Sequence, residues 1–344
     1  MSTATRSPRT RRLAGAAAAV AGLLAMAGCR HEMSSVNPAG AQAERISDLT
    51  WYLTWTGTAV FLAVTGFLLY ALFRARKRTE SLDGPAVERR MMIGVGAATG
   101  VTVLILLATL VYNFYTGRAL AQFAEPDALT IRVVGHQWWW EVQYMDPRFD
   151  RRVTTANEIH VPVGRRVRLE VQSRDVIHSF WVPSLHGKID LIPGYGGTTY
   201  FRADTPGVYQ GRCAEFCGAQ HANMNFLVMA DTPERFAAWY EAQVRSGAAP
   251  ADSLQQVGQQ VFLSKGCALC HTVRGTPAGS RIGPDLTHVG SRHTLGAGRI
   301  PNTRGHLAGW VSDPQAIKPG VKMPPNQLAG DELHALLDYL QSLK

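Results

Sequence analysis

Two thiols, an imidazole and a thioether lie within twelve residues of one another in the second half of the chain. The segment reads Cys213-Ala-Glu-Phe-Cys217 and continues to His221 and Met224. Soft sulfur ligands favour copper, and imidazole suits copper as well. His178 lies 35 residues before Cys213 in a strand-like run, so it could supply a second imidazole. Two thiolates on one loop can bridge two copper ions, each of which would take one imidazole and one weak ligand.

Two other chemistries are open to this segment. Cys213 and Cys217 could form a disulfide in an oxidising compartment, or they could belong to a zinc site. Neither alternative requires a methionine and an upstream histidine at these spacings, which Met224 and His178 provide. The pattern therefore favours copper.

A second cluster reads Cys267-Ala-Leu-Cys270-His271. This is the attachment motif of a c-type haem, in which the thiols bind the vinyl groups and the histidine is an axial ligand of iron. A lone motif of this kind also occurs in zinc and redox sites. Met323 is the only methionine after His271, which makes it the natural sixth ligand, and histidine–methionine ligation raises the reduction potential. Four further histidines are alternative ligands that we expect instead to be surface residues: His288, His293, His306 and His334.

Two uncharged apolar stretches precede both clusters, at residues 49–73 and 91–115. Each has 25 residues, and about 20 suffice to cross a bilayer as a helix. The basic residues between the two stretches are Arg74, Arg76, Lys77, Arg78, Arg89 and Arg90. The positive-inside rule makes this loop cytoplasmic, so we expect everything after residue 116 to lie on the periplasmic or extracellular side of the cell membrane.

The first residues of the chain are typical of a secretory signal. Arg9, Arg11 and Arg12 precede an apolar stretch at residues 13–28. The break before Cys29 is typical of a lipoprotein signal, which predicts a signal peptide at residues 1–28 and acylation of Cys29. The alternative is an ordinary cleaved signal with an incidental cysteine. The formal net charge of +9 is concentrated here and in the basic loop, so membrane orientation accounts for it and no nucleic-acid partner is expected.

The remainder of the chain divides into a β-rich and a helical part. Residues 129–134 and 166–172 alternate apolar and polar side chains, and similar runs separated by proline and glycine predict a sandwich or barrel. Residues 236–244 are expected to form a short closing helix, and residues 246–251 have the composition of a linker. Helical spacing of apolar residues follows at 254–262 and again at 333–343.

The copper segment resembles that of subunit II of haem–copper cytochrome c oxidase. That family places a histidine in an Asp-Val-x-His-Ser run and has the same order of cysteine, glutamate, cysteine, histidine and methionine. The resemblance implies a dinuclear, mixed-valence centre called CuA, in which two cysteines bridge both metals and two histidines are terminal ligands. The implied ligands here are His178, Cys213, Cys217, His221, Met224 and the backbone carbonyl of Glu215.

Other positions match the same family. The resemblance implies that the Glu215 side chain helps to hold a magnesium ion against subunit I, and that Lys188 and Asp190 lie at the contact with that subunit. In the aromatic run Trp138-Trp-Trp140, the match makes Trp138 the candidate for the point where electrons enter. The alternative is that these rings only pack between the copper domain and the membrane.

The last part of the chain resembles a class I cytochrome c. Gly258 and Phe262 precede the haem motif, Gly283-Pro-Asp-Leu follows it, and Lys322-Met-Pro-Pro comes later. The Gly283-Pro284 turn is expected to place a carbonyl near His271. The combination resembles a caa3-type oxidase subunit. It predicts a transmembrane hairpin at 46–116, an all-β cupredoxin-like CuA domain at 125–244 and a small all-α cytochrome c domain at 253–344.

The resemblance implies an electron-transfer subunit of a proton-pumping oxidase, and not a complete enzyme. Electrons would pass from an upstream cytochrome or bc1-type donor to one haem c, then to two copper ions, and then to haem a and the oxygen-reducing site in subunit I. Subunits I and III and membrane lipid are the expected partners, and no catalytic acid–base pair is identified. Glu88 is either a proton-channel residue or a solvated loop charge, because its surroundings depart from the family pattern.

Three rival classes are distinguishable. Nitrous oxide reductase would need a propeller domain and no pair of membrane helices, and a quinol oxidase subunit II lacks these copper ligands. A free-standing, membrane-tethered copper and haem electron carrier remains the alternative, because it would share every motif described above. Such a carrier would purify alone, whereas an oxidase subunit would bring haem a and a partner with many helices.

Overall fold

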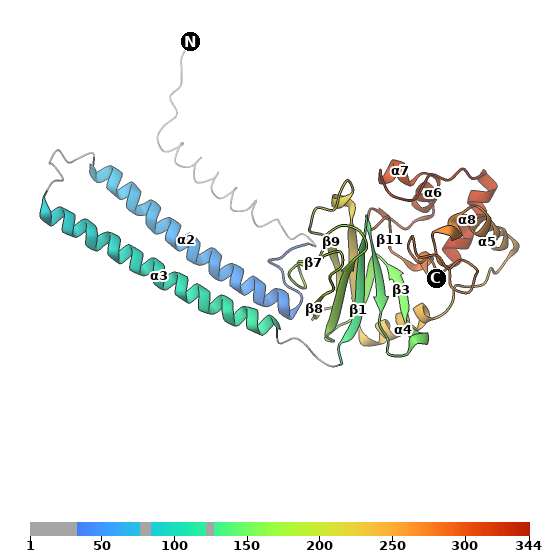
Figure 1. The fold of residues 1–344 in the computed structure, drawn as a ribbon, viewed down its shortest axis with the longest axis horizontal. Helices are drawn as coiled ribbons and strands as arrows, with labels where there is room; N and C mark the ends of the chain where they lie inside the picture. The colour runs from blue at the N-terminus through green and yellow to red at the C-terminus, as the bar shows by residue number, and fades with distance from the viewer. Residues whose placement is uncertain (1–32, 76–83, 122–126) are drawn as a thin grey trace, which may run out of the picture.

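The computed structural model describes residues 33–75, 84–121 and 127–344. Two long helices lie at one end of the molecule, a β domain lies in the middle and a small helical domain lies at the other end (Figure 1). The predicted signal peptide and Cys29 fall outside the described residues, as do Arg76, Lys77 and Arg78 of the basic loop. Three domains therefore follow one another in space in the same order as in the sequence.

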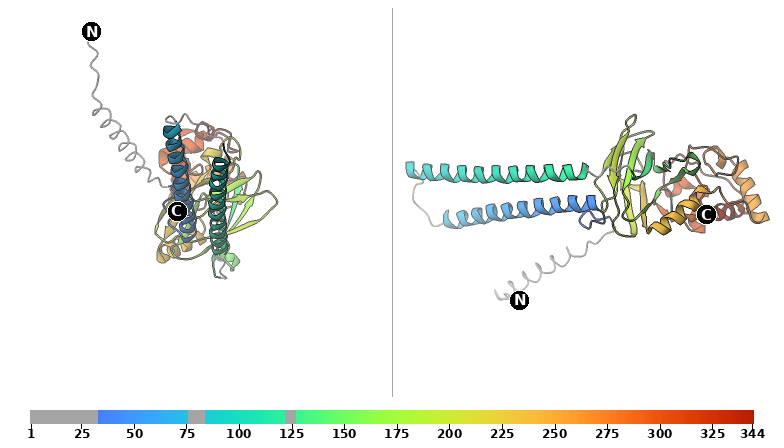
Figure 2. Two further views of the ribbon diagram at one scale, coloured as in Figure 1. Left: turned by 90° about the vertical axis from the view of Figure 1, so that its left-hand side faces the viewer. Right: turned by 90° about the horizontal axis from the view of Figure 1, so that it is seen from below.

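The two apolar stretches form helices α2 (Ala41–Ala75) and α3 (Pro85–Ala121), which extend beyond the uncharged residues at both ends. They run side by side, away from the β domain (Figures 1 and 2). The Tyr52 hydroxyl lies 3.2 Å from the Thr109 hydroxyl between them. The most apolar window of each helix has no residue buried inside the protein. Both helices are long and apolar enough to cross a membrane, as predicted, and Glu88 is exposed in the first turn of α3.

The chain just before α2 is joined directly to the β domain. The backbone N–H of Ala39 donates to the Ser184 carbonyl at 2.7 Å, and the Ala39 carbonyl accepts from the N–H of Asp204 at 2.9 Å. The Gln42 side chain, which is fully buried, accepts from the N–H of Arg202 at 3.2 Å. These contacts fix the start of α2 relative to the β domain.

Alternating side chains build two stacked sheets in the β domain. Within the described residues, one sheet has the strand order β3-β2-β1-β5-β8 and the other has the order β4-β10-β9-β6-β7. The strands are β1 (Leu129–His136), β2 (Trp139–Tyr144), β3 (Val153–Ala156), β4 (Glu158–Pro162), β5 (Val167–Ser173), β6 (His178–Trp181), β7 (Ile189–Leu191), β8 (Gly197–Phe201), β9 (Gly207–Cys213) and β10 (Asn225–Asp231). The predicted sandwich is therefore confirmed.

The inner faces of the two sheets share one apolar core. Trp140 on β2 is fully buried and packs edge-on against Phe180 on β6 and Phe226 on β10, with ring centroids 6.0 and 5.3 Å apart. Val167, Leu169 and Val171 of β5 are buried and alternate with more exposed residues, as expected for a strand with one face on a core. Helix α4 (Pro233–Val244) closes the domain with Phe236 and Tyr240 against this core.

The helical domain follows a short linker. Its helices are α5 (Ser253–Ser264), α6 (Arg304–Ser312), α7 (Pro314–Ile317) and α8 (Gly330–Ser342), with the short strands β11 (Thr294–Leu295) and β12 (Ile300–Pro301). Helices α5 and α8 cross closely at Gly258, where a Cβ atom would lie 2.1 Å from the Ala335 carbonyl oxygen. Only glycine allows that approach. The four helices confirm the predicted small helical domain, and the two-residue strands β11 and β12 are its departure from the all-α prediction.

Candidate metal centres

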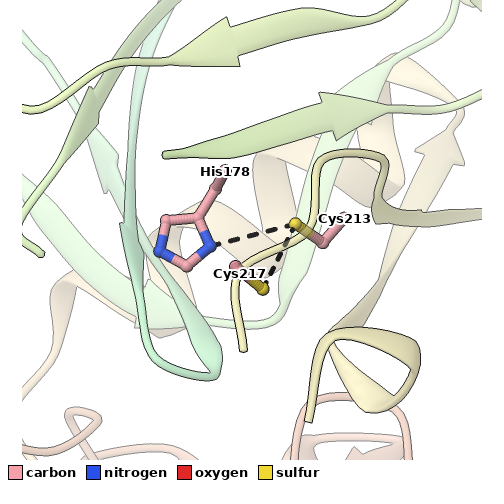
Figure 3. A group of neighbouring side chains, drawn as sticks. All are labelled: His178, Cys213 and Cys217. Atoms are coloured by element: carbon pink, nitrogen blue, oxygen red, sulfur yellow. Dashed lines mark hydrogen bonds between the residues drawn. The ribbon is translucent and has the colours of Figure 1, made fainter. Parts of the chain in front are cut away.

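The sulfur and imidazole groups of the copper segment converge at one end of the β domain. The Sγ atoms of Cys213 and Cys217 lie 3.7 Å apart and form no disulfide. Nδ1 of His178 lies 3.8 Å from Cys213 Sγ, and Nδ1 of His221 lies 3.6 Å from Cys217 Sγ. Met224 Sδ lies 3.8 Å from Cys217 Sγ. Figure 3 shows His178, Cys213 and Cys217 directed toward a common point. Two thiols, two imidazoles and a thioether therefore face one another and could hold soft metal ions.

Strand pairing brings these distant residues together. Cys213 ends β9 and pairs with Phe180 on β6, two residues after His178. The N–H of Cys213 donates to the Met224 carbonyl at 2.9 Å, which closes the loop that carries Cys217 and His221. The side chains of both cysteines, of His178 and of Met224 are buried. The sheet therefore determines where these four donors lie.

Asp175 fixes the orientation of His178, a role that the sequence analysis did not assign. Its Oδ1 accepts from Nε2 of His178 at 2.8 Å, which leaves Nδ1 facing the thiols. The same carboxylate accepts from the backbone N–H groups of Gln137 and Val176 at 2.7 and 2.8 Å. Burial alone would raise the pKa of Asp175, but these hydrogen bonds lower it below its ordinary value. A carboxylate behind a ligating histidine is a common way to set the ring orientation.

The two thiols cannot both ionise easily without a cation between them. The hydrogen bond from Cys217 stabilises the thiolate of Cys213 and lowers its pKa to about 3. The pKa of Cys217 is raised in turn, because its thiol keeps its proton in the hydrogen bond to Cys213, because burial disfavours its thiolate, and because a second negative charge would lie close to the first. Bound metal cations would remove this conflict, since metal binding deprotonates thiol ligands. The donor set is thus suited to soft metal ions.

Glu215 contributes to this end of the domain in two ways. Its carbonyl oxygen lies 3.2 Å from Cys213 Sγ, so it belongs to the same cluster of donor atoms. Its side chain points to the surface, where Oε2 lies 3.9 Å from Nζ of Lys188. Lys188 also pairs with Asp190 at 3.0 Å. The three residues that the sequence associated with subunit I and magnesium therefore share one exposed patch.

Trp138 contacts the copper loop directly. Its Nε1–H donates to the Cys217 carbonyl at 2.9 Å, and the side-chain amide of Gln137 donates to the same oxygen at 2.8 Å. Trp139 stacks on His136 with ring centroids 4.3 Å apart, whereas Trp140 lies in the core of the sandwich. The three tryptophans thus have different surroundings, and Trp138 alone among them hydrogen-bonds a residue of the predicted copper set within the described part of the chain.

The residues of the haem motif lie at the start of the helical domain. Cys267 and Cys270 are both free thiols. Nδ1 of His271 donates to the Pro284 carbonyl at 2.7 Å, as predicted for the Gly-Pro turn, and this leaves Nε2 available for iron. A Cβ at Gly283 would lie 2.7 Å from the His271 ring, so the turn can approach the ring only because glycine occupies that position. Met323 lies in the loop after α7. These donors suit a covalently attached haem.

The expectation that the four other histidines are surface residues was wrong for His288. That residue is 5% exposed, and its ring nitrogens lie 2.9 and 3.1 Å from the carbonyl oxygens of Lys344 and Arg245. Its ring lies between Arg245, just before the linker, and the last residue of the chain, and these two segments cover it. His306 and His334 are exposed, and His293 is largely exposed but contacts the β domain. Spacing along the sequence could not reveal a partner 43 residues away.

Two charged residues at the contact between the β and helical domains were not identified from the sequence. The carboxylate of Glu158 is 4% exposed and accepts from the N–H groups of His293 and Thr294 at 2.8 and 3.0 Å. Lys318 is 1% exposed, and its Nζ donates to the carbonyls of Trp138 and Gly296, each at 2.8 Å. Burial lowers the pKa of Lys318 to about 7. Both residues are isolated charges in the sequence, so only the tertiary structure identifies their partners.

Comparisons with known proteins agree with this arrangement. Residues 129–231 match the family described as cytochrome c oxidase subunit II, periplasmic domain, and residues 255–344 match cytochrome c. Cytochrome c oxidase subunit 2 of Alkalihalophilus pseudofirmus is 33% identical over 335 residues, which covers 93% of this chain and 94% of the relative. The chain belongs to the cytochrome c oxidase subunit 2 family. The Bacillus subtilis protein of the same name is 29% identical and covers 93% of this chain and 95% of its own length.

A solved structure matches part of this subunit 2 chain. The periplasmic domain of subunit II of cytochrome oxidase from Bradyrhizobium japonicum is 33% identical, with a TM-score of 0.33, and covers 36% of this chain and 96% of that domain. The two family matches and the full-length relatives confirm the predicted subunit II with a fused cytochrome c domain. They also confirm that the chain is a subunit of an oxidoreductase. The two matched domains indicate copper in one and haem c in the other.

Proposed function

We propose that the chain transfers electrons from its cytochrome domain to its copper domain, and from there to subunit I of a proton-pumping oxidase. A covalently held c-type haem and a pair of copper ions would supply one-electron redox chemistry. Cys267 and Cys270 would attach the haem, with His271 and Met323 as its axial ligands. The copper ions would be held by His178, Cys213, Cys217, His221, Met224 and the carbonyl of Glu215.

One observation carries this proposal. Two thiols that form no disulfide face two imidazoles and a thioether at 3.6 to 3.8 Å, at the end of the β domain that the cytochrome domain covers. A zinc site would not need the thioether, and a structural disulfide would not need the imidazoles. Four of these five donors, His178, Cys213, Cys217 and Met224, are buried, so we expect little rearrangement of the protein on a change of oxidation state.

We propose further roles for residues around the centres. Trp138 would be the point where electrons enter the copper domain, because its ring is bonded to the Cys217 carbonyl. Glu215 would help to bind magnesium against subunit I, with Lys188 and Asp190 at the same contact. This is supported by the exposed patch that these three side chains share.

We propose that the helices span the cell membrane and that the copper and cytochrome domains lie on its periplasmic or extracellular side. Residues 46–116 would form the hairpin, residues 125–244 the copper domain and residues 253–344 the cytochrome domain. Residues 1–28 would be a signal peptide and Cys29 a lipidation site. Subunits I and III, membrane lipid and an upstream cytochrome or bc1-type donor would be the partners. Arg74, Arg89 and Arg90 at the distal helix ends support this orientation.

The decisive test is the substitution Cys217→Ser in the intact membrane complex. We expect the variant to lose its copper and the near-infrared band of the copper pair while the haem remains, because the two ligand sets share no residue. The matched control is Cys267→Ser, which should impair haem attachment and leave the copper in place. Two copper ions still bound in Cys217→Ser would refute the assignment. Purification of the wild type without haem a or a partner subunit would favour the free-standing carrier instead.

A further inference from the structure

The loop that follows α7 connects the two redox domains. We call residues 318–323 the axial loop, because it ends at Met323. Lys318, its first residue, is buried at the domain contact, and its ammonium group donates to the carbonyls of Trp138 and Gly296. Within the described residues Lys318 forms no salt bridge, and these two carbonyl groups are its hydrogen-bond acceptors. A buried ammonium group is costly unless its hydrogen bonds are made, which makes this docking geometry specific.

Three further contacts place the axial loop on the copper side of the β domain. The side-chain amide of Gln220, one residue before His221, donates to the Pro319 carbonyl at 2.8 Å. Gly320 lies against the Trp138 ring, since a Cβ there would be 3.8 Å from two of the ring carbons. Nζ of Lys322 lies 3.8 Å from Asp175 Oδ2. The loop therefore contacts the residues that surround the copper ligands, and not a remote part of the sheet.

The cytochrome domain holds the other side of the axial loop. The side-chain amide of Gln315 on α7 donates to the carbonyls of Val321 and Met323 at 2.7 and 2.8 Å. Its Oε1 accepts from the N–H of Gly320 at 2.8 Å. The loop is thus tied at both faces, and a shift at Lys318 would be passed on to Met323.

We propose that Lys318 is a positioning residue for electron transfer between the two centres of this chain. Its ammonium group holds the axial loop on Trp138, whose ring N–H donates a hydrogen bond to the carbonyl of Cys217. The inference rests on the proposed function. In this electron-transfer step the cytochrome domain loses one electron and the copper domain gains it. No bond is formed or broken, and no proton is transferred. Tunnelling rates fall steeply with distance, so a loosened contact slows this step.

The test uses the intact oxidase complex with the substitution Lys318→Met, which keeps an apolar stem and removes the ammonium group. Rapid mixing with ascorbate and a small redox mediator would follow haem reduction and copper reduction separately. We expect haem reduction to be unchanged and the haem-to-copper step to slow several-fold, because the two centres would lie farther apart on average. Hydrogen exchange of the backbone amides in the axial loop should also rise. Lys318→Arg, which keeps donors and charge, should restore part of the rate.

The matched control is Lys265→Met. Lys265 belongs to the same domain but forms a half-exposed ion pair with Glu332, at 2.8 Å, between the end of α5 and the start of α8. This control should leave the rate and the exchange pattern of the axial loop unchanged. If the Lys318→Met variant loses haem or copper, the Lys318→Gln variant is measured in its place, because glutamine keeps a hydrogen-bond donor without the charge.

The outcomes separate this inference from the proposed function. A wild-type complex that never passes an electron from haem to copper would overturn the proposed function. A wild-type complex that passes it, at a rate that neither Lys318→Met nor Lys318→Gln changes, would overturn only the role of Lys318. A slower step with unchanged metal content, unchanged reduction potentials and faster amide exchange in the axial loop would support that role.

Discussion

Removal of the Asp175 carboxylate should weaken copper binding although Asp175 is not itself a predicted ligand. In Asp175→Ala, Nε2 of His178 loses its acceptor at 2.8 Å, and the N–H groups of Gln137 and Val176 lose theirs at 2.7 and 2.8 Å. His178 is 0% exposed, so water cannot easily replace the carboxylate. The ring is then free to turn Nδ1 away from Cys213.

The expected magnitude follows from two independent estimates. A buried donor left without its acceptor costs about 1–3 kcal/mol. Substitution of groups that orient a ligating histidine typically lowers metal affinity by roughly 10- to 100-fold, and a tenfold change corresponds to about 1.4 kcal/mol. Both estimates therefore predict a loss of one to two orders of magnitude in copper affinity. Asp175→Asn should lose less, because its amide oxygen can still accept one hydrogen bond.

The assay is copper retention by the purified complex against a graded series of chelators, with haem content as the internal reference. A closely matched control exists in the same domain, where Asp231 Oδ2 lies 2.8 Å from Nδ1 of His160, which is outside the copper set. Asp231→Ala should keep its copper. The reasoning would be refuted by unchanged affinity in Asp175→Ala, or by an equal loss in Asp231→Ala, which would indicate general destabilisation.

Two further predictions concern the cytochrome domain. Burial alone would raise the pKa of Glu158, but the hydrogen bond from His293 and the charge of Arg292 lower this pKa below its ordinary value of 4.5. The ionised carboxylate should therefore stabilise docking of the two domains above pH 4.5. This stabilisation should be lost as the pH falls through the lowered pKa. Amide exchange of Thr294 should show this acid dependence in the wild type and not in Glu158→Gln, and equal acid dependence in both would contradict the argument. Met323→His should keep the covalent haem but lower its reduction potential, because methionine ligation favours the reduced iron. A redox titration checks this, and an unchanged potential with the iron–methionine band intact would mean that another side chain caps the iron.

Local sequence patterns predicted most of the architecture for a physical reason. A stretch of 25 uncharged residues must satisfy its backbone hydrogen bonds internally in a bilayer, so it predicts a helix without knowledge of its neighbours. Alternating residues in β1 and β5 similarly predict strands with one buried face. Helices α6 and α7 were not predicted, and neither were β11 and β12, which have two residues each and are too short for any periodicity to appear.

Residues whose role depends on distant partners were missed or misjudged. Glu158 and Lys318 carry ordinary charged side chains, and nothing in their immediate sequence distinguishes them from solvated residues. Asp175 begins the Asp-Val-x-His-Ser run, but its hydrogen bond to His178 was not predicted from that run. His288 looked like a surface residue because its partners, Arg245 and Lys344, are 43 and 56 residues away. The energetic role of each of these side chains depends on its desolvation and on hydrogen bonds to residues that only the folded structure brings near.

The sequence by itself determined the chemistry of this subunit 2 chain. The kinds of donor atom, their order and their spacing predicted copper in one domain and a covalent haem in the other, because ligand preference depends on residue type and short-range reach. Only the tertiary structure decided how the two sites are coupled. It placed the loop of Met323 on Trp138, bonded that ring to the carbonyl of Cys217 and buried Lys318 between the domains. Those contacts join residues up to 180 positions apart, and such distances are set by folding and not by local sequence.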